Sequence, residues 1–104
     1  MIGLALTRRE VLYRTENISA NLAQNGIQSI FIHDAFDENA ACRVFAENSD
    51  GSVDVTIEYG YIPDLASVCK MWMVKDNNSN QVWYFDHHNV VLNFCIQMLK
   101  QDEE

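Results

Sequence analysis

Three consecutive residues near the end of the chain, Asp86-His87-His88, are of types that do metal or acid–base chemistry. They follow an apolar, strand-like run and precede an apolar, helix-like one, and imidazole and carboxylate groups suit zinc or manganese. A second pair of the same types, His33-Asp34, follows another strand-like run and could converge on the same place. The simpler interpretation is that Asp86 caps the following helix, that the two adjacent histidines face solvent and that His33 bonds Asp34.

The triplet resembles the Asp-His-His signature of a phosphoesterase superfamily, in which these side chains help to bind a divalent metal. That superfamily needs further acidic motifs on a catalytic domain several times this length, and the 104 residues contain none that we recognise. The chain also lacks the glycine-rich phosphate-binding patterns and the G-x-S-x-G nucleophile motif. We therefore expect no catalytic residue, no cofactor and no resident metal. A metal-dependent hydrolase or metal-binding protein built on this turn is the alternative.

The cysteines and the apolar runs bear on the cellular compartment. Cys42, Cys69 and Cys95 lie far apart, and an odd number without a C-x-x-C pair is typical of buried, reduced thiols in a cytoplasmic protein. Polar residues interrupt the longest apolar run, which is too short to cross a membrane. Arg8 and Arg9 follow the apolar start of the chain, which is the wrong order for a secretion signal. We expect a cytoplasmic protein without membrane contact.

Acidic residues outnumber basic ones by 15 to 7, and the formal net charge is −8. This balance disfavours binding to a nucleic-acid duplex, which needs clustered lysine and arginine. Four acidic residues lie on or beside one face of a predicted hairpin and are candidate partner-binding residues: Glu47, Asp50, Asp54 and Glu58. Such a face would attract a basic protein and make the encounter sensitive to salt. The alternative is that these side chains are only solvated.

The elements that position these residues begin with a helix over 8–24. Thr7 and Glu10 have the spacing of a capping box, in which each side chain accepts a hydrogen bond from the other residue's backbone amide. Apolar residues then recur at helical spacing, which indicates one buried stripe. Asn25-Gly26 supplies the left-handed stop.

The periodicity changes to two after this helix and predicts strands at 27–33, 40–47 and 52–60. Asn48 to Gly51 reads as the turn between the second and third strands, because glycine accepts the positive φ that such turns need. In the third strand, valine, isoleucine and tyrosine alternate with polar residues. One face of the sheet is therefore expected to be wet.

Two further strands, at 70–75 and 81–85, are apolar on both faces, which predicts that both faces are covered. The final helix, at 89–101, is apolar around most of its circumference, as is typical of a helix buried on more than one side. We expect one α+β domain over 1–104, in the order α-β-β-β-(short α or turn)-β-β-α. Its antiparallel sheet has about five strands, with a helix before and after it. This element order resembles that of type III secretion chaperones.

The last hairpin and the closing helix carry more apolar surface than one sheet contact hides. We therefore expect a homodimer with Trp83, Phe94 and Met98 at its interface, unless the N-terminal segment 1–6 folds back over the patch. Together these features favour a small, acidic, non-catalytic protein-binding domain of bacterial or phage type. It would act as an inhibitor, an immunity protein or a chaperone-like accessory protein. The last alternative is a structural homodimer with no charge-driven partner.

Overall fold

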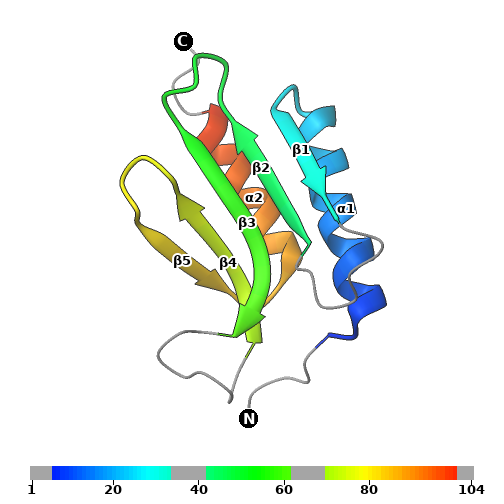
Figure 1. Cartoon of the computed structure of the whole chain (residues 1–104). Helices are drawn as coiled ribbons and strands as arrows, with labels where there is room; N and C mark the ends of the chain where they lie inside the picture. Colours follow the sequence, from blue (N-terminus) through cyan, green and yellow to red (C-terminus); the bar gives the residue numbers. More distant parts are fainter. Residues whose placement is uncertain (1–5, 34–41, 62–69, 101–104) are drawn as a thin grey trace.

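A computed structural model of the chain describes residues 6–33, 42–61 and 70–100 (Figure 1). Its elements are, in chain order, α1 (Arg8–Gln24), β1 (Gln28–Ile32), β2 (Arg43–Glu47), β3 (Asp54–Tyr61), β4 (Lys70–Asp76), β5 (Val82–Phe85) and α2 (His88–Lys100). This order confirms the expected α+β fold, with a five-stranded antiparallel sheet between an N-terminal and a C-terminal helix. Four predicted features lie outside the described residues: the short element before β4, Asp34, Cys69 and most of the N-terminal fold-back.

The start of α1 is the capping box that the sequence predicts. The backbone amide of Glu10 donates to Thr7 Oγ1 at 3.2 Å, and the amide of Thr7 donates to Glu10 Oε1 at 3.0 Å. Two amides that the helix itself cannot satisfy thus find partners. Within the helix, the fully buried Thr15 donates its hydroxyl proton to the carbonyl of Val11, so the interior of the fold contains no unbonded hydroxyl there.

The end of α1 is a Schellman motif. Gly26 has a φ of +77°, and its amide donates to the carbonyl of Ala23 at 3.0 Å. The amide of Ile27 donates to the carbonyl of Leu22 at 2.9 Å, and the side chains of both residues are buried. This pattern is the glycine-dependent stop expected at Asn25-Gly26, and it turns the chain directly into β1.

The strands form a meander in which each one pairs with its chain neighbours, in the order β1-β2-β3-β4-β5. Both helices lie against the same face of this sheet and against each other (Figure 1). α1 packs on β1 and β2, while α2 packs on β4 and β5. The covered face is therefore shared between the two helices, and neither of them crosses to the other side.

The core forms where this covered face meets the helices. One row of side chains runs in register across all five strands: Phe31, Val44, Ile57, Val74 and Trp83. Ile18 and Leu22 of α1 and Val91, Cys95 and Leu99 of α2 close over the sheet, and all five are buried. On α2 the buried residues recur every four positions, so a single stripe of the helix faces the core.

One expectation about the last hairpin is met on only one face by the described elements. The apolar residues on both faces of β4 and β5 predicted cover on both sides, but the described helices lie on one side only. Trp72 is buried beneath the helices, whereas Tyr84 on the opposite face is exposed and Met73, its partner in register, is half-buried. On this face, neighbouring outward side chains shield one another in part.

The capping box gives a direct test of the first element. Replacing Thr7 by alanine removes the acceptor for the Glu10 amide and should lower the free energy of unfolding by about 1 kcal/mol. Thr7→Ser keeps the hydroxyl and should behave like the wild type. The measurement is the urea unfolding midpoint of the three proteins, and an unchanged midpoint for Thr7→Ala would mean that the box adds no stability.

Candidate functional site

The face of the sheet opposite the helices, which we call the open face, carries three of the four acidic residues that the sequence singles out, Glu47, Asp54 and Glu58. Its side chains form rows in register across the strands, of which the first is Ile32, Arg43, Glu58, Met73 and Tyr84 and the second is Ile30, Phe45, Thr56, Lys75 and Val82. A third, shorter row holds Gln28, Glu47 and Asp54. Isoleucines thus mark the β1 edge of the open face, and the acidic residues lie on β2 and β3.

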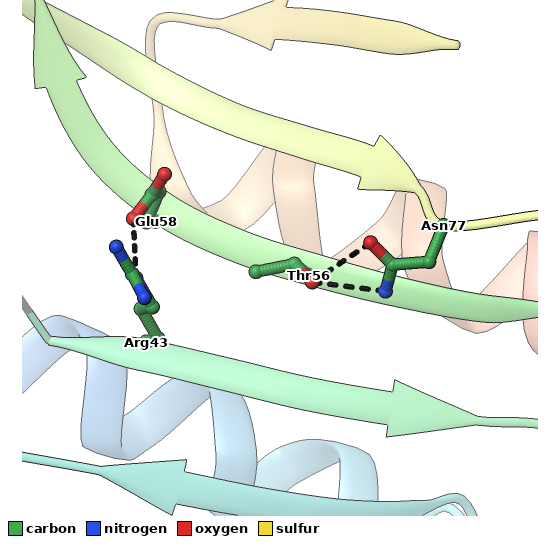
Figure 2. Close-up of polar contacts among 4 residues, drawn as sticks. All are labelled: Arg43, Thr56, Glu58 and Asn77. Atoms are coloured by element: carbon green, nitrogen blue, oxygen red, sulfur yellow. Dashed lines mark hydrogen bonds and ion pairs between the residues drawn. The ribbon is translucent and has the colours of Figure 1, made fainter. Parts of the chain in front are cut away.

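The carboxylate of Glu58 forms an ion pair with a residue of the adjacent strand. Arg43 Nε lies 2.9 Å from Glu58 Oε2, and the two residues are direct partners in the β2–β3 register (Figure 2). An exposed pair of this kind contributes little to stability, about 0–1 kcal/mol. The Arg43 guanidinium nevertheless neutralises the charge of Glu58. This predicted partner-binding residue therefore already has a cationic partner within the chain.

The N-terminal end of β3 is hydrogen-bonded to the turn between β4 and β5. Asn77 Nδ2 donates to Thr56 Oγ1 at 2.9 Å, and the Thr56 hydroxyl lies 3.2 Å from Asn77 Oδ1 (Figure 2). The backbone amide of Asn77 donates to the Asp54 carbonyl at 2.8 Å, and its side-chain amide also reaches Asp54 Oδ1 at 3.3 Å. This one asparagine therefore fixes the turn against the acidic end of the open face.

Glu47 and Asp54 are the acidic pair that the fold brings together. They are direct partners in the β2–β3 register, and neither has a cation within ion-pair distance among the described residues. They line a hollow of about 200 Å³ with Gln28, Ile30, Phe45 and Ala46. Like charges placed directly opposite each other destabilise a sheet, and a cation bound between them relieves that repulsion.

Asp50, the fourth predicted partner-binding residue, has a structural role in the β2–β3 turn. Its Oδ1 accepts a hydrogen bond from the amide of Ser52 at 3.0 Å, and this bond lowers the pKa of Asp50. Asn48, which is buried, accepts from the amide of Val53 and donates to the Ser52 hydroxyl. Gly51 supplies the positive φ of +75° that the sequence predicts. Asp50 thus lies beside the acidic pair and does not join it.

The residue that caps α2 is not Asp86, as the simplest interpretation of the sequence had it. The carbonyl of His87 accepts the first helical hydrogen bonds, from the amides of Val90 at 3.1 Å and Val91 at 3.2 Å. His87 and not Asp86 therefore occupies the cap position, because the cap residue is the one whose carbonyl begins the helical ladder. Both residues are exposed, and His88 is already the first residue of the helix.

Among the described residues, the histidines do not gather with other ligands into a metal site. His88 lies against Arg14 of α1, whose Nη1 is 3.0 Å from one ring nitrogen and 3.1 Å from the other. His33 stacks on Phe31 with ring centroids 6.3 Å apart. Within the described ranges, no three histidine, cysteine, aspartate or glutamate side chains are close enough together to hold a metal ion. The contact between Arg14 and His88 has no signal in the sequence, because 74 residues separate the two.

The described thiols are unsuited to nucleophilic chemistry. Cys42 and Cys95 are both buried and unbridged. Burial raises the pKa of Cys95 to about 12, and burial also raises the pKa of Cys42 against the opposing effect of Arg8. Since the thiolate is the reactive form, neither group attacks a substrate at neutral pH.

The residues predicted for a dimer interface make contacts inside the chain. Trp83, Phe94 and Met98 are half-buried and pack against the core. The ring of Phe94 lies 5.0 Å from those of both Trp83 and Phe85, a spacing typical of favourable aromatic pairs. Large apolar side chains are exposed elsewhere, at Tyr13, Ile30, Ile32, Tyr84 and Val90. No sequence pattern distinguishes Ile30 and Ile32 as exposed, because both faces of their strand carry large apolar residues.

Comparison with known proteins leaves the fold and the open face as the only guides to function. No protein-family model, no curated protein and no solved structure matches the chain. In the part that the structure describes, no helix is both long and apolar enough to cross a membrane. The chain is thus defined as an α+β domain whose helices share one sheet face and whose other face bears an acidic pair beside exposed isoleucines.

His88 makes stability depend on pH. Burial lowers its pKa below the ordinary value, and the positive charge of Arg14 and the neighbouring His87 add to this effect. The unfolded chain therefore takes up this proton at a higher pH than the folded chain does. The His88 contribution to folding is complete above the unfolded pKa of about 6.5 and is lost as the pH falls through that value toward the lower folded pKa.

We expect the urea midpoint of the wild type to decline as the pH is lowered from about 7 to about 5. His88→Gln should lose the His88 part of this decline. His87→Gln should keep most of it, because burial and the charge of Arg14, the two larger causes of the lowered pKa of His88, remain. Parallel pH profiles for His88→Gln and the wild type would contradict this assignment.

Alkylation tests the state of Cys95. In the folded protein at mildly alkaline pH, iodoacetamide should leave Cys95 unmodified, because its raised pKa and full burial keep the thiol protonated and inaccessible. Urea should make it react at the rate of a free thiol. Peptide mass spectrometry identifies the modified residue, and rapid labelling of Cys95 in the native protein would show that the helix opens.

Proposed function

We propose that this protein is a non-catalytic binding domain that recognises a basic partner protein through the open face. The observation that carries the proposal is the acidic pair, Glu47 and Asp54, which are direct partners in the β2–β3 register and have no cation within ion-pair distance among the described residues. A lysine or arginine side chain placed in the hollow that both residues line would offset the like charge of this pair.

The walls of the hollow support a basic side chain over a small inorganic cation. Ile30 and Phe45 line it beside the two carboxylates. Lysine and arginine have long apolar stems that cover apolar surface while their charged heads reach an acidic or aqueous environment. A hollow with isoleucine and phenylalanine on one side and carboxylates on the other therefore matches both parts of such a side chain.

The charge of the whole chain favours the same class of partner. A formal net charge of −8 on 104 residues speeds the encounter with a basic surface and repels acidic ones, nucleic acids included. Charge steering is strong at low salt and weak at high salt, since the Debye length falls from about 10 Å at 0.1 M to about 3 Å at 1 M.

In biological terms, this mode of binding fits an inhibitor, an immunity protein or a chaperone-like accessory protein, which acts by covering a basic surface of another protein. We propose a cytoplasmic location, because unbridged, buried cysteines such as Cys42 and Cys95 are typical of a reducing compartment. A homodimer built on Trp83, Phe94 and Met98 is not needed to bury these residues, since each already packs on the core of its own chain.

The acidic pair can be tested with a matched pair of variants. Glu47→Gln/Asp54→Asn removes two charges from the open face and keeps a side-chain oxygen that accepts the Asn77 hydrogen bond. Glu16→Gln/Asp86→Asn removes the same charge from exposed positions on α1 and before α2. Both should fold like the wild type, and the first should gain some stability from the lost repulsion.

The measurement is retention of host proteins on the immobilised variants at about 0.1 M and about 1 M salt, quantified by mass spectrometry. We expect at least one basic protein to be retained by the wild type and by Glu16→Gln/Asp86→Asn, to be released at high salt and to be lost from Glu47→Gln/Asp54→Asn. Equal losses from both variants would mean that only total charge matters, and no retained protein would argue against the proposed function.

A further inference from the structure

Among the described residues, β1 is an edge strand without the usual protection of an edge. It is the first strand in the sheet order, and the described residues make no backbone hydrogen bond to it other than its pairing with β2. Its five residues, Gln28–Ile32, contain no charge, no proline and no glycine. Proteins commonly block exposed edges with charged side chains, proline or bulges, because a bare edge pairs readily with another strand.

The side chains of β1 make its two faces unequal. On the covered face, Ser29 donates to the carbonyl of Ser19 on α1 at 3.0 Å, which holds the strand against the helix. On the open face, Ile30 is 58% exposed and Ile32 is 48% exposed. A strand fixed on one side and apolar on the other is a preorganised template, and a ligand that pairs with it loses little free energy in ordering it.

We propose that β1 docks an extended basic segment of the partner protein, which adds to the sheet as a sixth strand. The proposal rests on the proposed function and names how the partner binds. An added strand lies about 4.8 Å from β1, so its outward side chains pack beside Ile30 and Ile32. A lysine or arginine on that strand lies across Ile30 and places its charge in the hollow beside Glu47.

Charge decides between this occupant and a second copy of the chain. A second copy at β1 brings another formal charge of −8 and another acidic pair close to the first, so like charges face each other. A basic segment brings the opposite charge to the same place. The other edge strand, β5, is less suited to such a segment, because Lys75 lies on the open face of the adjacent β4 and directly opposite Val82.

The probe is a capped peptide of about eight residues that alternates lysine and valine, a length that covers an edge strand. Two control peptides have the same length. One alternates lysine and proline, which keeps the charge and removes the strand-forming backbone, and the other alternates glutamate and valine. Binding to the full chain is measured by titration calorimetry, and hydrogen exchange reports which backbone amides the bound peptide protects.

Ile30→Thr/Ile32→Thr is the matched protein variant. Threonine keeps the β-branched shape that strands favour, and both positions are exposed, so the variant should fold with an unchanged unfolding midpoint. We expect the lysine–valine peptide to bind the wild type at least about tenfold more tightly than either control peptide and about tenfold more tightly than it binds the variant. Its binding should protect amides of β1 and leave those of β5 unchanged.

Each other outcome overturns the inference. Equal binding of the lysine–valine and lysine–proline peptides, lost in Glu47→Gln/Asp54→Asn, would leave the proposed function standing without strand addition. Protection at β5 would move the docking edge, and no binding of the lysine–valine peptide would rule out the β1 mode while host-protein retention still reports on the function. A doubled mass in light scattering that Ile30→Thr/Ile32→Thr returns to the monomer value would identify a second copy as the occupant.

Discussion

The rest of the structure depends on one row of side chains, which runs from Phe31 through Val44, Ile57 and Val74 to Trp83 beneath the helices. Side chains alternate between the faces of a sheet, so a slip of one residue would turn a whole strand inside out. Burying this row therefore also fixes the register of the open face. The burial of Val44 against Ile57 is what places the neighbouring charged residues opposite one another.

The signals in the sequence were strongest where they were local. The capping box at Thr7 and Glu10 and the stop at Gly26 each need only a few neighbouring residues, and both are present. The alternation of β3 is equally local, because its polar and apolar residues separate cleanly. For β1 the alternation shows which residues share a face but not which face is buried. Ile30 and Phe31 are both apolar, and only packing against α1 decides which of them is covered.

Features that depend on the pairing of distant segments were out of reach of the sequence. Nothing in the sequence ranks any of the four acidic candidates above the others. The β2–β3 register separates them, because it pairs Glu58 with Arg43 and places Glu47 opposite Asp54. The histidines looked like one group because two are adjacent, yet helix geometry sends His88 toward Arg14 and leaves His87 in solvent. Both faces of the last hairpin were expected to be covered. The composition of β4 and β5 shows how apolar they are, but it does not show on which face of the sheet the helices pack.

The shared helical layer also has a consequence for synthesis of the chain. α2 is the last described element, and its buried residues Val91, Cys95 and Leu99 complete the core that α1 and the sheet begin. While this part of the chain is still inside the ribosome tunnel, β4 and β5 have no helix beneath them, and the hairpin is apolar on two uncovered faces. The nascent sheet is therefore most exposed to aggregation and to chaperones just before α2 emerges.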